Sequence, residues 1–320
     1  MSPEAPAGNP AGGGTVTVLA TAVTLMVGVE RSGGGGGGEV HLHAGGQAFW
    51  VARMAARLGA RVTLVGPFGG ESGIALRALI EAESVGVRAI ETCRPNAVWV
   101  SDDAEGESAT VSEIAPPTLT RHESDGLANA ALGSGLESDV TVLTGGPPGV
   151  LGADRYRSLA HDLHAVGGRV MADLSGDQLQ EALAGGLHLV KVANDELVEA
   201  GIADDDRPEA LLEGARRMRA RGAGAVMVSR AEEPLLAILG EQVVEVGTPA
   251  FRPVNHRGAG DSMTGAAAAA LAAGDDLEQA VRLAVAAGAL NVTRRGLGSG
   301  DARAVRRLAE RVELRQVDAA

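Results

Sequence analysis

The chain alternates short apolar runs with longer segments whose apolar residues recur every three or four positions. Short runs of this kind are typical of buried strands, and the longer segments are typical of helices that pack one face on a sheet. The order of the two predicts an α/β fold with a mostly parallel sheet and helices on both faces. The expected strands are 62–65, 139–143, 169–172, 187–190 and 225–229, the expected helices are 73–83, 154–166 and 208–221, and the pattern from 261 is helical almost to the end.

Two stretches interrupt this alternation. Residues 23–43 contain a run of six glycines, 33–38, which has no side chains to pack and which we expect to be a mobile loop. Residues 89–111 alternate apolar and polar positions around a turn at 102–106, as a hairpin does. We therefore expect the two stretches to form a small β-sheet lid on the α/β body.

Composition narrows the classes of protein. The chain has 320 residues, a formal net charge of −13 and one cysteine, Cys93. The charge argues against binding to nucleic acid or an anionic membrane, and one cysteine excludes an internal disulfide and a Cys-rich zinc site. Without a signal peptide or a spanning apolar run, a cytoplasmic protein is expected. We expect a disordered tail at 1–14, rich in Pro, Ala and Gly, and one domain at 15–320.

The most informative motif opens the predicted helix that follows a glycine-rich turn. Gly258, Ala259 and Gly260 have small side chains that leave the backbone N–H groups open, and Asp261 follows them. Because a helix N-terminus concentrates positive potential, these groups can hold a phosphate or a developing anion, and Asp261 can take a proton from an attacking hydroxyl. The alternative is an ordinary glycine turn with Asp261 or Ser262 as the helix cap.

Two further segments are candidates for binding. The single lysine of the chain, Lys191, lies at the end of a predicted strand, where open α/β sheets bind ligands, and Asn194 and Glu196 follow it. Lys191 could meet a nucleotide phosphate, and Asn194 or Glu196 could hold Mg²⁺ through water; an exposed, capped strand end is the alternative. The Gly45–Gly46 turn enters a helix and could let a small substrate approach the backbone, although ordinary helix entry is possible.

Taken in this order, the motifs resemble those of the ribokinase-like (PfkB) carbohydrate kinases, nearest the branch of phosphofructokinases and tagatose-6-phosphate kinases. The resemblance runs from about 15 to 314 and includes 173–176, 24–25 and 94–96. It implies a ribokinase-like three-layer fold with a β lid, transfer of the ATP γ-phosphate to a sugar or sugar phosphate with Mg²⁺, and a homodimer through the lid.

The resemblance also implies roles for single residues. Asp261 would be the general base, with Gly258, Ala259 and Gly260 as the anion hole. Glu196 would hold the metal. The substrate would meet Glu30, Gly45, Gly46, Gln47, Trp50 and Arg94, and the nucleotide would meet Lys191, Asn194, Ser229, Arg230, Gly258, Gly260 and Asn291.

Departures from the branch pattern cluster in the binding segments. Glu30 replaces the usual Asp, Trp50 stands where an Asn would touch the sugar, and the nucleotide turn after Ser229 lacks its glycines. The loop 144–149 lacks a serine that would contact a substrate phosphate, a loss on the order of 1.5–3 kcal/mol. Two hypotheses follow: an active kinase whose acceptor is not simply fructose phosphate, or a catalytically weak member that senses a metabolite or nucleotide.

Overall fold

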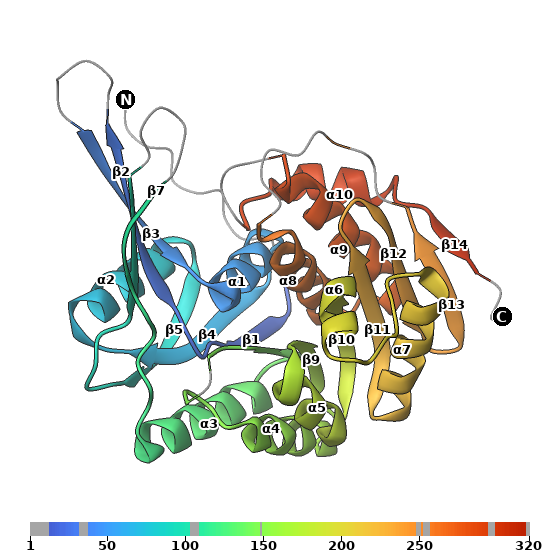
Figure 1. Cartoon of the computed structure of the whole chain (residues 1–320), viewed down its shortest axis with the longest axis horizontal. Coiled ribbons are helices and arrows are strands. Elements are labelled where there is room, and N and C mark those ends of the chain that lie inside the picture. Colours follow the sequence, from blue (N-terminus) through green and yellow to red (C-terminus); the bar gives the residue numbers. More distant parts are fainter. Residues whose placement is uncertain are drawn as a thin grey trace.

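A large twisted sheet forms the centre of the molecule (Figure 1). The computed structural model describes residues 13–31, 38–102, 109–147, 149–247, 251, 257–293 and 298–317. The large sheet consists of β1 (Thr15–Leu19), β4 (Arg61–Phe68), β5 (Val85–Glu91), β8 (Val140–Thr144), β9 (Arg169–Asp173), β10 (Leu187–Ala193), β11 (Ala223–Arg230), β12 (Glu233–Leu239), β13 (Gln242–Val246) and β14 (Leu314–Gln316).

The strands follow the order β14-β13-β12-β11-β10-β9-β8-β1-β4-β5. From β5 to β11 every neighbouring pair is parallel, whereas β12, β13 and β14 add an antiparallel edge. The carboxyl ends of the parallel strands therefore lie along one edge, which is where open α/β sheets place their ligands.

A separate small sheet projects from one end of this body. It consists of β2 (Thr24–Arg31), β3 (Gly38–Gly45), β6 (Ala97–Asp102) and β7 (Ala109–Ile114), in the order β3-β2-β6-β7. Its strands come from the two stretches that interrupt the α/β alternation. The expected start of the second stretch, at residue 89, is wrong. Residues 89–91 belong to β5 and pair with β4 in the large sheet, and the small sheet resumes only at β6.

Helices cover both faces of the large sheet. They are α1 (Gln47–Arg57), α2 (Gly70–Ala82), α3 (Arg121–Leu136), α4 (Ala153–Ala165), α5 (Gly176–Gly185), α6 (Asn194–Glu199), α7 (Pro208–Ala220), α8 (Ala259–Ala272), α9 (Leu277–Asn291) and α10 (Ala302–Ala309). Side chains of α1, α2, α8, α9 and α10 pack in one buried cluster, and those of α3, α4, α5 and α7 pack in another.

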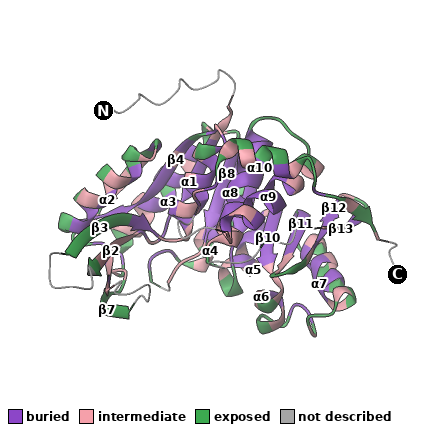
Figure 2. Cartoon of the chain, turned by 90° about the horizontal axis from the view of Figure 1, so that it is seen from above, coloured by how far each residue is buried: buried purple, intermediate pink, exposed green. Residues whose placement is uncertain are grey.

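The alternation of side chains along each strand divides the core between these two clusters. In β9, Met171 belongs to the first cluster, while Val170 and Ala172 belong to the second. This is the arrangement that a strand buried on both faces produces. Figure 2 shows the buried residues concentrated in the sheet and in the helix faces that cover it.

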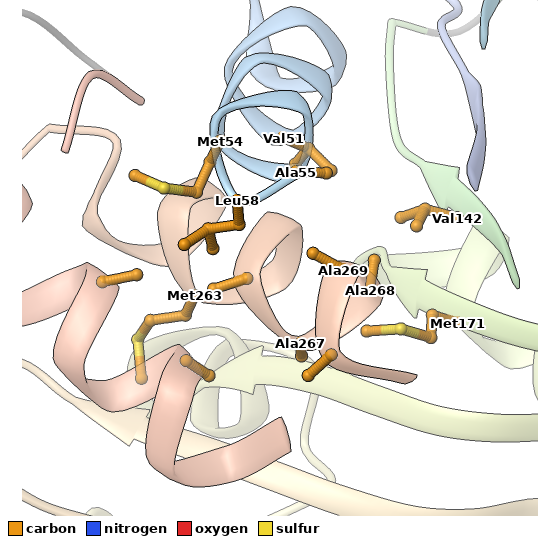
Figure 3. Packing of buried hydrophobic residues seen from close by; sticks show 14 of the residues in the cluster. Val51, Met54, Ala55, Leu58, Val142, Met171, Met263, Ala267, Ala268 and Ala269 are labelled. Atoms are coloured by element: carbon orange, nitrogen blue, oxygen red, sulfur yellow. The ribbon is translucent and has the colours of Figure 1, made fainter. Parts of the chain in front are cut away.

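Buried side chains of α8 pack against those of α1 (Figure 3). Both helices begin at the edge where the parallel strands end, because Gln47 binds the Asp173 carbonyl oxygen and Gly260 lies against Lys191. A Cβ atom at Gly265 of α8 would come within 2.4 Å of the Val51 carbonyl oxygen of α1, so the close contact of the two backbones requires a glycine there. Because both helices begin at this edge, the Gly45–Gly46 turn and the Gly258 turn lie near each other.

The mostly parallel sheet with helices on both faces is confirmed. The structure adds α3, α5, β12 and β13, for which the chain pattern gave no expectation, and the C-terminal helical region ends in β14. Of the expected tail at 1–14, the glycine loop at 33–38 and the turn at 102–106, residues 1–12, 33–37 and 103–106 lie outside the described residues. The described remainder is ordered: the Gly14 carbonyl oxygen accepts from the Arg61 N–H at 2.9 Å, Gly38 pairs with Arg31 in the small sheet, and Asp102 pairs with Ala109. Among the described helices, none combines the length and apolar character needed to cross a lipid bilayer.

Candidate active site

A buried ion pair marks the carboxyl ends of two neighbouring strands. Asp173 ends β9, Lys191 lies opposite it on β10, and Asp173 Oδ1 is 3.5 Å from Lys191 Nζ. Only 3% of the Asp173 side chain and 8% of the Lys191 side chain are exposed. Each charged group therefore has the other as its partner in place of solvent water. The motif pattern predicts a role for Lys191, whereas Asp173 belongs to it only as part of the segment 173–176.

The helix α8 begins directly beside this pair. Gly258 is its N-cap with φ 71° and ψ 7°, a left-handed conformation that glycine adopts without strain. A side chain at Gly260 would displace the lysine, because a Cβ atom there would lie 2.5 Å from Lys191 Nζ. The ammonium group therefore rests against the first turn of α8, next to the N–H groups of the proposed anion hole.

Asp261 lies in this first turn, partly buried, and its carboxyl group is strongly perturbed. Burial, together with the nearby negative charges of Asp173 and Glu196, raises its pKa from 3.8 to about 7, although Lys191 opposes the shift. A carboxyl group with a pKa near neutrality can both accept and return a proton, which is the property that a general base requires.

The same carboxylates act on Lys191. Burial by itself lowers the pKa of the ammonium, but Asp173, Glu196 and Asp261 outweigh it, and the pKa of Lys191 lies above its ordinary value. Lys191 is therefore charged at neutral pH. One buried cation faces three carboxyl groups, so the electrostatic environment at this end of the sheet favours an additional positive charge.

Glu196 and Asn194 lie at the start of α6, directly after β10. The Glu196 Oε2 atom accepts a hydrogen bond of 2.8 Å from the Ala193 N–H and so caps this short helix. Burial raises the pKa of Glu196, while the Ala193 N–H and Lys191 act in the opposite direction. Glu196 is thus close enough to Lys191 for their charges to influence each other. Asn194 precedes Glu196 by two residues and is partly exposed.

Ser229 and Arg230 end the adjacent strand β11. Ser229 lies opposite Ala193 in the sheet, and its hydroxyl donates a 3.4 Å hydrogen bond to the Val192 carbonyl oxygen. The Arg230 guanidinium donates to the Pro234 carbonyl oxygen at 3.1 Å. Both expected nucleotide residues therefore lie on the same edge as Lys191, one strand further along.

Asn291 has a structural task in the fold. It is fully buried at the end of α9; its amide donates to the Arg257 carbonyl oxygen at 2.8 Å, and its Oδ1 accepts from the Gly298 N–H at 3.0 Å. The residue thus ties the turn before α8 to the chain after α9. These contacts use its polar atoms to hold the backbone next to Gly258.

The Gly45–Gly46 turn reaches the same cluster through Gln47. Gly46 is the N-cap of α1 with φ 109°, and a Cβ atom at Gly45 would lie 2.4 Å from Met26 Sδ. The Gln47 Nε2 atom donates a 3.2 Å hydrogen bond to the Asp173 carbonyl oxygen. The helix α1 is therefore anchored to the end of β9, beside Lys191.

Trp50 follows in the first turn of α1. It is partly buried and packs against the hydrophobic cluster below α1, and the Gly298 backbone lies so close that a Cβ atom there would be 2.7 Å from the Trp50 carbonyl oxygen. Trp50 thus lies between the core and the backbone at Gly298, which Asn291 holds in place. Packing in this position buries part of its apolar ring.

Arg94 is exposed in the connection between the large and the small sheet. This connection is held by Asn96, a buried residue whose Oδ1 accepts from the Gly69 N–H at 2.9 Å and whose amide donates to the Pro67 carbonyl oxygen at 2.9 Å. The Asn96 carbonyl oxygen also accepts from the Ser72 hydroxyl at 3.2 Å. Arg94 is therefore presented to solvent from a firmly fixed loop.

Glu30 lies apart from this cluster. It is exposed near the far end of β2, opposite Glu39 of β3, and its carboxylate is 3.5 Å from His41 Nε2. Since Thr24, opposite Gly45, is six residues back along β2, Glu30 is roughly 20 Å further along the strand. The structure does not bring Glu30 together with the other candidate substrate residues within this chain.

Two residues of the cluster were missed in the sequence analysis. Asp173 was noted only as part of a segment, and Thr264, whose hydroxyl donates to Asp173 Oδ2 at 2.7 Å, was not considered. For Asp173 the available sequence signal was an acidic residue at the end of an otherwise apolar strand. For Thr264 the sequence carried no signal, because a threonine within an Ala-rich helix is ordinary.

The comparisons with known proteins give the family of the chain. The model of the pfkB family carbohydrate kinases matches residues 20–303. The chain is 32% identical over 260 residues to the ATP-dependent 6-phosphofructokinase isozyme 2 of Escherichia coli K12, covering 79% of this chain and 82% of that protein. It is 30% identical over 256 residues to the 1-phosphofructokinase of Rhodobacter capsulatus, covering 77% and 78%.

Solved structures give the same result for the fold. The phosphofructokinase-2 of Escherichia coli in complex with substrates and products superimposes with a TM-score of 0.77 and 25% identity, over 93% of this chain and 99% of that one. A ribokinase of Arabidopsis thaliana complexed with ribose and ATP has a TM-score of 0.72 at 19% identity, over 93% and 99%, which shows the shared fold.

The family model and these relatives define a phosphotransferase that acts on a sugar hydroxyl. The chain belongs to the PfkB family of carbohydrate kinases, and within it to the phosphofructokinase-like members, for which ATP is the co-substrate. The ribokinase-like fold class expected from the motif order is thereby confirmed.

Proposed function

We propose that the enzyme transfers the γ-phosphate of Mg²⁺-ATP to a hydroxyl of a phosphorylated sugar, with Asp261 as the general base. The observation that carries this proposal is the carboxyl group of Asp261 itself. It lies in the first turn of α8 beside Lys191, with a pKa of about 7. Phosphoryl transfer requires positioning and charge stabilisation more than covalent chemistry, and this cluster supplies both.

In this mechanism Asp261 accepts the proton of the acceptor hydroxyl as its oxygen attacks the γ-phosphorus. The N–H groups of Ala259 and Gly260, at the positive end of α8, face the transferred phosphoryl group. Lys191 adds a full positive charge next to Gly260, where the missing Cβ atom allows the ammonium to approach. Both features stabilise negative charge on the phosphoryl oxygens as the bond to ADP breaks.

A divalent cation would be held by Glu196 together with the nucleotide phosphates, because carboxylate and phosphate oxygens are the ligands that Mg²⁺ prefers. Asp173 would not be a ligand, because its carboxylate is already held by Thr264 and Lys191. Glu196, with Asn194 beside it, would hold the ion. When bound, Mg²⁺ neutralises charge on the nucleotide phosphates.

On the substrate side, the Gly45–Gly46 turn would let the sugar approach the backbone, and Gln47 fixes that turn to β9. Arg94 would pair with a phosphate that the acceptor already carries, because a guanidinium forms two parallel hydrogen bonds to such a group. Ser229 and Arg230 lie one strand beyond Lys191 and would line the nucleotide site.

The test is a coupled assay of ADP formation with fructose 6-phosphate, fructose 1-phosphate, tagatose 6-phosphate, ribose and fructose. We expect turnover with a phosphorylated ketose, a loss of about a thousandfold in kcat for Asp261→Asn, and for Arg94→Ala a rise in KM for the phosphorylated acceptor. No turnover with any acceptor, together with measurable ATP binding, would instead favour the sensor hypothesis.

We further propose that two copies of the chain pair through the small sheet. Its outer strands β3 and β7 carry exposed apolar side chains, with Val40 63%, Leu42 47%, Val111 63% and Ile114 54% exposed. The register of the sheet places Val40, Leu42 and Ile114 on the same face, and apolar side chains that share an exposed face are typical of an interface. One phosphofructokinase-2 structure from Escherichia coli, 25% identical with a TM-score of 0.80, is described as a tetrameric inhibited form.

A further inference from the structure

Thr264 connects the catalytic helix to the buried ion pair. It lies within α8, three residues after Asp261, and is fully buried. Its hydroxyl lies 2.7 Å from Asp173 Oδ2 and 3.1 Å from the Gly260 carbonyl oxygen, but it has one proton to donate. A carboxylate is the stronger acceptor and is the closer one, so the proton belongs to Asp173.

Asp173 is therefore held from three sides by three elements. Thr264 of α8 binds its Oδ2, Lys191 of β10 lies beside its Oδ1, and Gln47 of α1 binds its main-chain carbonyl oxygen. The carboxylate is fixed in one orientation, and Oδ1 remains directed at Lys191.

Lys191 needs this support because of where it lies. Its ammonium rests against Gly260 in the first turn of α8, where the helix dipole is positive and repels a cation. The side chain of a lysine has four rotatable bonds and leaves such a place readily unless a fixed anion keeps it there. Asp173 is the anion that lies nearest in the sheet, one strand away.

We propose that Thr264 is a positioning residue for phosphate transfer: by holding Asp173, it keeps Lys191 at the first turn of α8. The inference rests on the proposed role of Lys191 at the nucleotide phosphates. Thr264 itself touches neither substrate. Its effect is carried through Asp173, and it appears as weaker ATP binding and slower transfer.

The test compares Thr264→Val with a matched control, Thr17→Val. Thr17 is also fully buried, and its hydroxyl lies 2.7 Å from Ser138 Oγ, but it lies in β1 outside the site. For Thr264→Val we expect the Kd of ATP, measured by calorimetry, to rise about fivefold and kcat/KM for ATP to fall about tenfold. We expect Thr264→Ser, which keeps the hydroxyl, to have a Kd and a kcat/KM for ATP close to those of the wild type. We expect both values for Thr17→Val to stay within about twofold of the wild type.

A second measurement asks whether Thr264 acts through Lys191. In a Lys191→Met background, Thr264→Val should change the Kd of ATP by less than about twofold, since the side chain to be positioned is gone. Equal effects in both backgrounds, or equal kinetics for Thr264→Val and Thr17→Val, would overturn the proposal. Should Thr264→Val fail to fold, Thr264→Ala replaces it, because alanine puts no methyl group against the carboxylate.

The two proposals fail separately. ATP binding is measured without an acceptor, so the role of Thr264 is tested even if no sugar phosphate is turned over. Conversely, an active wild type whose Thr264→Val variant matches the Thr17→Val control removes the positioning role and leaves the proposed function standing.

Discussion

At the scale of single residues, the protonation of Asp261 couples activity to stability. With a pKa of about 7, the carboxyl group is protonated below neutrality and cannot accept a proton, so kcat should rise as the pH increases through about 7. A pH–rate profile with a saturating acceptor measures this. A kcat that is constant between pH 5.5 and 8.5 would contradict the assignment of Asp261 as the base.

The same pKa shift predicts how stability depends on pH. Because the pKa of Asp261 is raised from 3.8 to about 7 in the folded protein, the folded state binds this proton more tightly than the unfolded chain. Its contribution to stability is complete below about pH 3.8 and is lost as the pH rises through about 7. In the ligand-free protein, the Tm of Asp261→Asn relative to wild type should therefore be higher at pH 8 than at pH 5. The opposite order would contradict the shift.

At the scale of the elements, the start of α8 depends on the missing side chain of Gly260. In Gly260→Ala the new Cβ atom would lie 2.5 Å from Lys191 Nζ and 3.1 Å from its Cε, so the end of the lysine must move away. We expect kcat/KM for ATP to fall about tenfold or more. The Tm should fall as well, because the displaced ammonium leaves the buried Asp173 carboxylate less well paired.

The matched control is Gly126→Ala, within the helix α3. A Cβ atom there meets nothing closer than Ile90 Cγ2 at 3.7 Å, which is ordinary contact. Replacing a glycine inside a helix should stabilise the fold by about 0.5–1 kcal/mol and leave kinetics unchanged. Wild-type kcat/KM in Gly260→Ala would show that Lys191 does not act from its place beside α8.

At the scale of the whole molecule, four of the eight large hydrophobic side chains that are exposed in the described part of the chain lie on β3 and β7 of the small sheet. A charged group within an interface is costly to bury, so Leu42→Asp should convert a dimer to a monomer in light scattering after gel filtration. The control is Ile74→Asp on α2, which is 73% exposed and lies outside the small sheet. A monomeric wild type, or the same shift in the control, would refute pairing through this sheet.

Hydrophobic periodicity and turn chemistry are local properties, so the alternation of strands and helices and the glycine turn before Asp261 follow from the order of the amino acids. The meeting of Asp173, Lys191 and Thr264 does not, because their contacts join elements that are far apart in the chain and come together only on folding. The same packing raises the pKa of Asp261, which depends on burial and on neighbouring charges that no local pattern contains. It also placed Glu30 at the far end of the small sheet, because the register of β2 with β3, rather than the motif order, fixes where that side chain lies.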